Sequence, residues 1–195
     1  METKGRIRKE VLARRDALTE EERRQKSSMI MEKVLAAESC RRAENLLVYV
    51  NYKSEVCTEE LIFSALEEGK AVYCPKVSGE EMDFYRILSM RDLREGYRGI
   101  REPEAAAERL FDSKNAGTFQ TMLLMPGSVF DRNRNRIGYG KGYYDKYLER
   151  NPGLKTIGVC FDCQMEDEIP FDIYDKRPDM VITESRVIKN ILLLA

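Results

Sequence analysis

The sequence feature that most constrains the fold is a nearly continuous apolar run, TMLLMPGSVF, at residues 121–130. A strand with one solvated face alternates apolar and polar residues, whereas a continuous run is typical of a strand buried on both faces. A glycine-rich stretch and then a segment expected to be helical, residues 143–150, follow the run directly. The run therefore predicts a strand inside a largely parallel sheet that helices cover on both sides.

Segments of both kinds alternate along the rest of the chain. One helix start is marked by a capping box, in which Glu22 follows Thr19 by three residues. Further strands are expected at residues 45–52, 71–77, 82–87, 155–162 and near 180–188, and further helices at 2–18, 19–37 and 58–68. Residues 91–116 are mixed and charged, with a short Ala-rich helix. The pattern predicts a single α/β domain over residues 1–195, a three-layer α/β/α arrangement around a largely parallel central sheet.

Composition excludes several classes of protein. The 195 residues include 33 basic and 34 acidic side chains, a formal net charge of −1. A binder of nucleic acid or of anionic membranes normally carries a basic excess, so neither partner is expected. No window approaches 18 uninterrupted apolar residues, and the amino terminus does not resemble a signal peptide. We therefore expect a cytoplasmic protein whose partners are small molecules, and we expect it to be a monomer.

The chain contains no histidine. Ser-His and Cys-His nucleophiles, histidine proton shuttles and the usual zinc sites are therefore excluded. Among its five cysteines, Cys160 and Cys163 form a C-x-x-C pair. Because no second pair completes a zinc tetrad and residues 156–159 look like a buried strand, we interpret the pair as structural and reduced.

Residues 130–145 are the most informative for chemistry. Their alternate glycines are Gly138, Gly140 and Gly142. Such glycines expose backbone N–H groups that can surround an anion, and the following helix directs its positive end to the same place. Arg136 and Lys141 add charges suited to phosphate oxygens, and Asp145 could hold Mg²⁺ against them. The stretch therefore predicts a Mg–ATP phosphate site.

Two other interpretations of this stretch remain open. It could be a mobile loop kept soluble by its charges, or its glycines could serve only a tight strand-to-helix turn, since it matches neither GxxxxGK[ST] nor GxGxxG. It could also bind RNA, because basic and aromatic side chains interleave in it: Arg132, Arg134, Arg136, Tyr139, Lys141, Tyr143 and Tyr144. The balanced net charge and the buried strand before it argue against RNA.

The first predicted helix adds an independent indication. At about 100° per residue, Lys4 and Arg8 lie beside the apolar stripe formed by Ile7, Val11 and Leu18, where solvated charges are not expected. Two inward-leaning cations one turn apart suggest a bound anion. The alternative is that both side chains snorkel from the edge of the stripe.

The residues together resemble the 5-formyltetrahydrofolate cyclo-ligase family, also called methenyltetrahydrofolate synthetase, over essentially the whole chain. The most specific match is MPGSVFDRNRNRIGYGKGYYD at residues 125–145. Weaker matches follow in the expected order: Lys4-x-x-x-Arg8, Ser54-Glu55-Val56, Phe161-x-x-Gln164, Ile169-Pro170, Tyr174-Asp175, Pro178-Asp179 and Ile182-Thr183-Glu184. Asn135 departs from the family's usual glycine and Ile137 from its leucine. Because Asn tolerates positive φ, we expect the turn at Asn135 to survive.

The resemblance implies an enzyme that converts 5-formyltetrahydrofolate to 5,10-methenyltetrahydrofolate with ATP as co-substrate and Mg²⁺ as cofactor. The family's formyl oxygen attacks the γ-phosphoryl group to give an N5-iminium phosphate, N10 closes on the activated carbon, and ADP and phosphate are released. The substrate supplies its own nucleophiles, so a chain without histidine fits this chemistry, which needs mainly positioning and charge neutralisation.

The resemblance also implies site residues. The expected catalytic residues are Arg136, Lys141 and Tyr144. The expected ATP contacts are Lys4, Gly5, Arg6, Ile7 and Arg8 with Arg136, Ile137, Gly138, Tyr139, Gly140, Lys141, Gly142, Tyr143 and Tyr144. The expected folate contacts are Val50, Glu55, Tyr139, Gly140, Lys141, Gly142 and Tyr143, and the expected metal ligands are Asp145 and Asp175. Read locally, Asp175 is an ordinary loop carboxylate and Glu55 a residue approaching the helix at 58.

Three rival functions remain at this point. The first is an ATP-dependent ligase or kinase of the same architecture acting on another small molecule, since a fold does not fix a substrate. The second is a relative that has lost catalysis and acts as a regulatory binding module, which the intact set of Arg136, Lys141 and Asp145 argues against. The third is an RNA-binding protein, which would retain single strands in a salt-sensitive way.

Overall fold

The computed structural model describes residues 3–96, 99–112, 114 and 120–189, and its centre is a seven-stranded sheet. The strand order is β12-β11-β9-β6-β1-β2-β3. The strands are β1 (Asn45–Val48), β2 (Ala71–Ser78), β3 (Glu81–Ile87), β6 (Thr121–Met125), β9 (Lys155–Val159), β11 (Met180–Ile182) and β12 (Val187–Lys189). All neighbours pair in parallel except the two edge strands, β3 and β12. The predicted α/β fold with a largely parallel sheet is confirmed.

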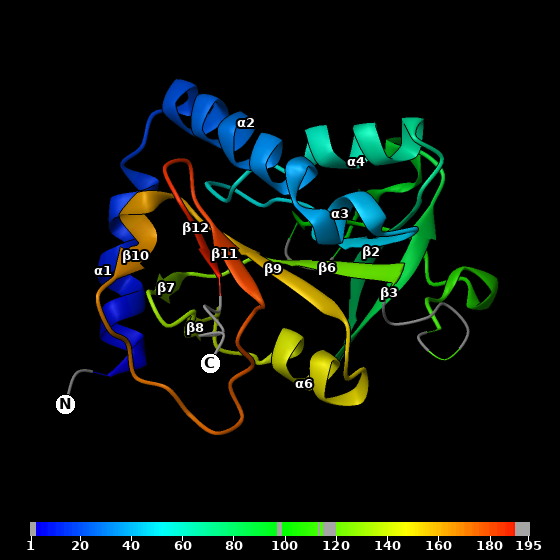
Figure 1. The fold of residues 1–195 in the computed structure, drawn as a ribbon. Coiled ribbons are helices and arrows are strands. Elements are labelled where there is room, and N and C mark those ends of the chain that lie inside the picture. The colour runs from blue at the N-terminus through cyan, green and yellow to red at the C-terminus, as the bar shows by residue number, and fades with distance from the viewer. Residues whose placement is uncertain (1–2, 97–98, 113, 115–119, 190–195) are drawn as a thin grey trace, which may run out of the picture.

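Helices lie on both faces of this sheet (Figure 1). On one side are α2 (Glu20–Ala36), α3 (Glu38–Arg42) and α4 (Glu59–Glu67), and on the other is α6 (Tyr143–Arg150). The side chains alternate accordingly, because successive strand residues point to opposite faces. Leu46 and Val48 join the core under α2 and α4, whereas Leu47 joins the core under α6 with Leu123 and Tyr147. The expected three layers are therefore present.

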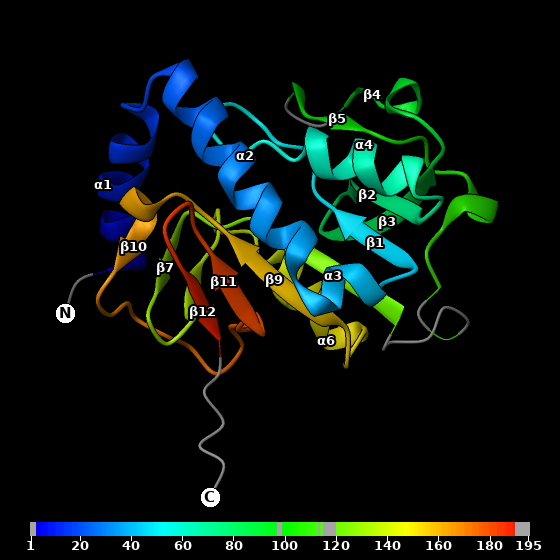
Figure 2. The ribbon, with the colours of Figure 1, turned by 45° about the horizontal axis from the view of Figure 1, so that its top comes forward.

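A second, three-stranded sheet holds the amino-terminal helix. It consists of β10 (Met165–Glu166), β7 (Val129–Asp131) and β8 (Arg136–Ile137) in that order. Helix α1 (Lys4–Asp16) packs on it through Ile7 and Val11, which contact Val129 and Ile137 in one buried cluster. Figures 1 and 2 show α1 beside β7 and β10, at one end of the central sheet.

The apolar run at 121–130 does not form one strand. It forms β6 in the central sheet and β7 in the small sheet, separated at Pro126 and Gly127. Proline cannot donate to a strand ladder. At Gly127 a Cβ atom would lie 2.4 Å from the Phe130 ring, so only glycine allows the chain to turn there.

Three other strands are shorter than predicted. The segment near 180–188 is a hairpin, in which β11 pairs antiparallel with β12 around a turn closed by Thr183 N–H to Arg186 O at 2.9 Å. The strand predicted at 45–52 ends at Val48, and the strand predicted at 155–162 ends at Val159. A 3₁₀ turn, Asp162–Gln164, follows β9 and replaces its expected end.

The helix predictions hold more closely. Helix α2 begins after Thr19, and the capping box between Thr19 and Glu22 is present in both directions. The poorly patterned segment at 91–116 contains a short hairpin, β4 (Arg94–Glu95) with β5 (Arg101–Glu102), and 3₁₀ turns at Met90–Asp92 and Ala107–Arg109. Within the described residues, no helix combines the length and apolar character needed to cross a bilayer.

The parallel strands position the site. Strands β1, β6 and β9 run in one direction, so the segments that follow them leave the same edge of the sheet. Contacts between these segments confirm that they meet. Gln164 Nε2, after β9, donates to the carbonyls of Gly127 and Ser128, after β6, at 2.9 and 3.0 Å. Arg15 of α1 reaches Ser54, after β1.

Candidate active site

Residues 138–142, between β8 and α6, form the glycine loop on which the predicted site depends. Gly140 and Gly142 have φ values of +99° and +67°, which side chains with a Cβ rarely adopt. Gly142 immediately precedes α6, so the loop leads directly into the positive end of that helix. The glycines thus allow a backbone conformation that residues with a Cβ rarely adopt, directly before a helix end that favours anions.

The two α1 cations predicted to lean inward have different partners, of which only one belongs to the loop. Arg8 Nε donates to the Gly138 carbonyl at 2.8 Å, and its guanidinium nitrogens lie against Gly140. Lys4 Nζ forms an ion pair with Asp175. The three other α1 residues expected to contact ATP differ in placement: Ile7 is buried in the core, whereas Gly5 and Arg6 are exposed.

The base of the loop is formed by Arg136, which is only 6% exposed. Its Nη2 donates to Asp145 Oδ1 at 2.8 Å, its Nη1 donates to the Pro126 carbonyl at 3.3 Å, and its Nε has no partner. Its Cζ lies 5.7 Å from the Tyr144 ring centroid. A buried guanidinium with one N–H left unpaired keeps hydrogen-bonding capacity that the described residues do not use.

At the tip of the loop, Lys141 is exposed and forms no hydrogen bond or ion pair with any described residue. Its charge is therefore available to a ligand. Tyr143, also expected at the site, directs its hydroxyl away, to the Gly79 carbonyl at 3.2 Å. Tyr144 is partly buried, and its hydroxyl has no hydrogen-bond partner among the described residues. Burial raises the pKa of Tyr144 well above its usual value, so the phenol stays protonated.

The two predicted metal ligands are linked through the Lys176 N–H, which follows Asp175 in the chain and donates to Asp145 at 3.0 Å. Asp145 accepts hydrogen bonds from Arg136 and from the Lys176 N–H on the same oxygen, Oδ1. Asp175 accepts from Lys4 and from the Asp172 N–H, both on Oδ2. Within the described residues, each carboxylate therefore keeps one oxygen without a hydrogen-bond donor.

These two oxygens fit magnesium, which is usually held by one or two carboxylates together with water and substrate phosphates. Among the described residues, no three His, Cys, Asp or Glu side chains cluster as a metal site. The protein alone thus supplies an incomplete ligand set, which phosphate oxygens would complete.

The segment after β1 provides the predicted folate side of the site. Val50 is buried, and Glu55 accepts from the Tyr52 N–H at 2.9 Å and interacts electrostatically with the Tyr139 hydroxyl. Burial raises the pKa of the Glu55 carboxyl, while these two interactions and the charge of Arg15 act in the opposite direction. The structure therefore places Glu55, which the sequence predicts to contact folate, near Tyr139 of the glycine loop.

Sequence reasoning missed Arg15, which is 5% exposed and donates to both Ser54 and Tyr139. Burial alone would lower the pKa of Arg15, but Tyr139, Glu55 and Asp16 raise it, so it stays charged. The helical spacing could have indicated Arg15. It lies eleven residues after Lys4, and at about 100° per residue it points within about 20° of the direction of Lys4.

The turn before the loop corrects another expectation. The residue with positive φ is Arg134, at +65°, and Asn135 does not take that role. Asn135 is buried, and hydrogen bonds satisfy its polar groups. Its N–H and Nδ2 both donate to Asp131, at 2.8 and 2.7 Å, and its Oδ1 accepts from Arg177. Asp131, fully buried and also missed, orders this turn. Ile137, expected as an ATP contact, has its side chain in the α1 core.

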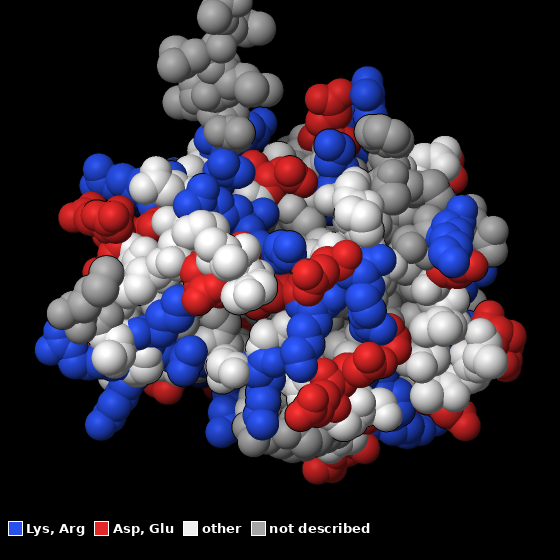
Figure 3. Space-filling model, turned by 90° about the horizontal axis from the view of Figure 1, so that it is seen from below, with Lys and Arg blue, Asp and Glu red and all other residues white. Residues whose placement is uncertain are grey.

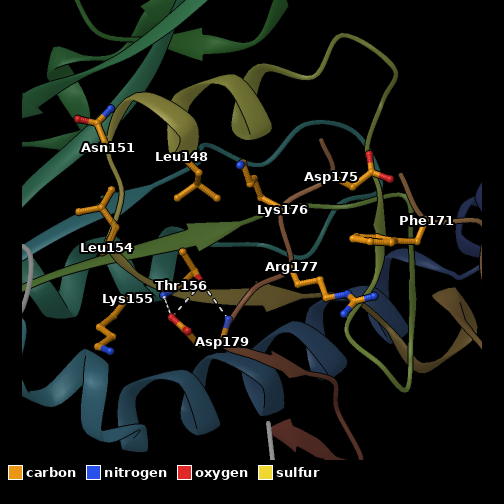
Figure 4. Close-up of a pocket in the computed structure, with 11 residues that line it drawn as sticks. Leu148, Asn151, Leu154, Lys155, Thr156, Phe171, Asp175, Lys176, Arg177 and Asp179 are labelled. Carbon is orange, nitrogen blue, oxygen red and sulfur yellow. Dashed lines mark hydrogen bonds between the residues drawn. The ribbon is translucent and has the colours of Figure 1, made fainter. Parts of the chain in front are cut away.

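A hollow of about 430 Å³ lies elsewhere, at the amino-terminal end of β9 (Figure 4). Its labelled lining residues are Leu148, Asn151, Leu154, Lys155, Thr156, Phe171, Asp175, Lys176, Arg177 and Asp179. Asp179 accepts from the Thr156 N–H and hydroxyl at 2.8 and 3.1 Å, and Arg177 is bonded to Asn135. The hollow touches the active site only through Asp175 and Lys176.

Two further interpretations concern the cysteines and the surface. Cys160 is buried with its Sγ 3.6 Å from the Met165 Sδ, Cys163 is partly buried, and both are free thiols. Burial raises the pKa of both thiols, which opposes the thiolate character of a redox pair.

Figure 3 shows basic and acidic side chains interleaved over the face seen from below, as the balanced net charge predicts.

The chain is similar to known proteins over most of its length. Residues 1–184 match the sequence model of the 5-formyltetrahydrofolate cyclo-ligase family. The probable 5-formyltetrahydrofolate cyclo-ligase of Schizosaccharomyces pombe is 32% identical over 180 residues, 85% of this chain and 87% of the relative. The 5-formyltetrahydrofolate cyclo-ligase of Mus musculus is 30% identical over 188 residues, 91% and 92% of the two chains. The NMR structure of Aquifex aeolicus 5,10-methenyltetrahydrofolate synthetase superposes with a TM-score of 0.82 at 32% identity. The superposition covers 95% of this chain and 92% of the Aquifex aeolicus chain.

Proposed function

This chain belongs to the 5-formyltetrahydrofolate cyclo-ligase family, and we propose that it uses ATP to convert 5-formyltetrahydrofolate to 5,10-methenyltetrahydrofolate. The observation that carries the proposal is the charge arrangement around the glycine loop. Arg136 is buried beneath the loop with an unpaired Nε, and Lys141 is exposed at its tip without a partner among the described residues. Such an arrangement suits a phosphate chain that is bound at one end and reacts at the other.

The reaction fits a site without a protein nucleophile. The formyl oxygen attacks the γ-phosphorus of ATP, the bond from that phosphorus to the bridging oxygen breaks, and ADP leaves. The product of this step is an N5-iminium phosphate. N10 of the folate then forms a bond to the activated carbon and loses its proton, and the C–O bond breaks to release inorganic phosphate. The chain's residues contribute by binding, orientation and charge.

Each cation has a defined part in this proposal. Arg136 and Lys141 neutralise the charge of the transferred phosphoryl group, and the N–H groups of the loop and of the first turn of α6 surround it. Arg8 fixes the loop through the Gly138 carbonyl and presents its remaining guanidinium N–H groups beside Gly140. Lys4 holds Asp175 in place. The Tyr144 ring centroid lies 5.7 Å from the Arg136 Cζ, and we assign its unpartnered hydroxyl to contact with both substrates.

Magnesium and the folate complete the assignment. Asp145 and Asp175 would each offer their free oxygen to Mg²⁺, which when bound would neutralise phosphate charge. Val50, which is buried, and Glu55, which accepts from the Tyr52 N–H, would contact the folate. The cytoplasmic location and the monomeric state remain predictions from the sequence.

The direct test is the growth of the methenyltetrahydrofolate absorbance band in a mixture of the protein, 5-formyltetrahydrofolate, ATP and Mg²⁺. We expect the band to grow in the complete mixture and to be absent when ATP or Mg²⁺ is omitted. ATP binding without product would favour a ligase or kinase acting on another small molecule. A protein that neither forms product nor binds ATP would contradict the proposal.

A further inference from the structure

Arg15, in the last turn of α1, is a charged residue held out of solvent in a helix whose other cations are mostly exposed. Arginine is rarely buried to 5% exposure unless its guanidinium is paired. Its Nε donates to Ser54 Oγ at 3.0 Å, its Nη1 donates to the Tyr139 hydroxyl at 2.7 Å, and its Nη2 lies 3.6 Å from Asp16 Oδ1. Ser54 in turn donates to the Asp16 carboxylate. The guanidinium thus faces the site from a fixed position.

Tyr139 depends on these polar contacts for its orientation. The residue is 47% exposed, so packing fixes little of its ring. Its hydroxyl accepts a hydrogen bond from Arg15 Nη1 at 2.7 Å and interacts electrostatically with the Glu55 carboxylate. At neutral pH the phenol keeps its proton, so the hydroxyl can donate to Glu55. The bond from Arg15, whose Nε also holds Ser54 next to Glu55, therefore sets the direction of the hydroxyl.

The chain Arg15–Tyr139–Glu55, called here the tyrosine latch, joins three elements far apart in sequence. Arg15 belongs to α1, Tyr139 to the glycine loop, and Glu55 to the segment after β1. The first two elements carry the proposed ATP contacts and the third carries the proposed folate contacts. The glycine loop has a separate attachment to α1 in Arg8, which bonds the main chain at Gly138.

We propose that Arg15 is a positioning residue, which orients the Tyr139 hydroxyl so that Glu55 is held in the orientation in which it receives the folate substrate. This inference rests on the proposed function, in which Glu55 contacts folate. Because Arg8 secures the loop independently, loss of the latch weakens folate binding and leaves ATP binding largely intact. A merely structural role for Arg15 would instead lower stability and affect both substrates alike.

The test measures KM for each substrate in Arg15→Met, Tyr139→Phe and the double variant. Methionine keeps much of the apolar stem of Arg15 without the charge, and phenylalanine keeps the ring of Tyr139. Loss of one charge-assisted hydrogen bond predicts a rise of about tenfold in KM for 5-formyltetrahydrofolate in each single variant, with KM for ATP within about twofold. Both substitutions remove the same set of contacts between Arg15, Tyr139 and Glu55. We therefore expect KM for 5-formyltetrahydrofolate to rise about tenfold in the double variant, well below the product of the two single effects.

Matched controls separate positioning from folding. Arg14→Met removes the neighbouring arginine, which is exposed and paired with Glu166, and is expected to leave both KM values unchanged. Arg15→Lys restores a cation that can donate to Tyr139 but cannot form the same fork of contacts, so partial recovery of KM for folate is expected. If Arg15→Met fails to fold, Tyr139→Phe carries the test, since its change is a single half-exposed hydroxyl.

Hydrogen exchange of the amides at residues 138–142 provides a readout that needs no turnover. We expect faster exchange in Arg15→Met and Tyr139→Phe than in the wild type and in Arg14→Met, because the tip of the loop loses a tether. If the wild type forms no methenyl product, the proposed function is wrong and the exchange result alone decides whether the latch holds the loop. Unchanged exchange, equal rises in the two KM values, or fully additive effects would each overturn the proposal.

Discussion

At the residue scale, Lys141 offers the clearest separation of catalysis from stability. Its side chain is exposed and has no partner among the described residues, so Lys141→Ala should leave the melting temperature nearly unchanged. Removal of a charge directed at the transferred phosphoryl group should lower kcat by about 10²–10³-fold. Lys146→Ala, which removes an exposed lysine one turn further along α6, is the matched control and should retain activity. Equal activity in the two variants would remove Lys141 from the mechanism.

Glu55 gives a pH dependence whose sign follows from its surroundings. The titratable and charged groups that face it are Arg15, Tyr139, Tyr49 and Tyr144. Burial raises the pKa of Glu55 above its usual value of 4.5, so the carboxylate takes up its proton at higher pH than an exposed glutamate. Folate binding that needs the carboxylate should weaken as the pH falls through this raised pKa.

Tyr139→Phe should move this loss of folate binding at low pH, the acid limb of the pH profile, to higher pH. The Tyr139 hydroxyl lowers the pKa of Glu55, so its loss lets the pKa rise further. The measurement is kcat/KM for 5-formyltetrahydrofolate from about pH 5 to 8, a range in which exposed glutamates stay ionised. A limb that stays in place, or moves to lower pH, would show that Glu55 does not control folate binding.

The two carboxylates make a prediction about metal. Asp145→Asn and Asp175→Asn each remove a charged oxygen that is free in the described structure, so each should raise the Mg²⁺ concentration needed for half-maximal rate by about tenfold. Asp167→Asn, which changes an exposed carboxylate paired with Arg132, is the control. Unchanged titrations in both site variants would contradict the metal assignment.

Most of the charged site residues could be predicted from the sequence, and the exceptions have a physical reason. Lys4, Arg8 and Arg136 belong to local patterns, a helical stripe and a glycine-rich block. Arg15 gains its role from Ser54 and Tyr139, which only the fold brings to it. Asp131 is similar, because its four hydrogen bonds come from a turn and from Ile169.

At the scale of the elements, the turn between β7 and β8 holds a non-glycine residue in the left-handed region. Arg134, with φ +65°, donates to the carbonyls of Pro178 and Asp179 at 2.8 and 3.2 Å. Arg134→Ala and Arg134→Gly lose these bonds equally, but only glycine relieves the strain. The glycine variant should therefore be more stable than the alanine variant by about 1 kcal/mol in urea unfolding. Equal stabilities would show that the turn relaxes around alanine.

The elements also show which parts of the fold the sequence could predict. The capping box at Thr19 and the alternation of strands and helices depend on neighbours in the chain, and both are confirmed. The split of the run at 121–130 depends on the Phe130 ring beside Gly127, a contact that exists only after folding. The hairpin near 180–188 depends on the turn at Thr183, whose strands are only three residues long.

At the scale of the whole molecule, the parallel sheet brings the segments after β1 and β6 to one edge, and α1 lies across both. Glu55, which we propose contacts folate, follows β1, and the glycine loop follows β6 through the small sheet. Helix α1 contacts the loop through Arg8 and Arg15, the segment after β1 through Arg15, and Asp175 through Lys4. Two substrates can therefore be oriented against each other by elements that the fold already fixes. This arrangement explains how a chain without histidine can support phosphoryl transfer, which needs position and charge more than acid–base groups.

The measurement that tests this account most directly follows the formyl oxygen through the reaction. 5-Formyltetrahydrofolate labelled with ¹⁸O in the formyl group is converted by the protein with ATP and Mg²⁺, and the released phosphate is analysed by mass. If the formyl oxygen attacks the γ-phosphorus, one ¹⁸O atom appears in each inorganic phosphate, and at matched time Lys141→Ala releases about 10²–10³-fold less of this labelled phosphate. Methenyltetrahydrofolate formed together with unlabelled phosphate would contradict the account, because phosphoryl transfer to the formyl oxygen would not have occurred.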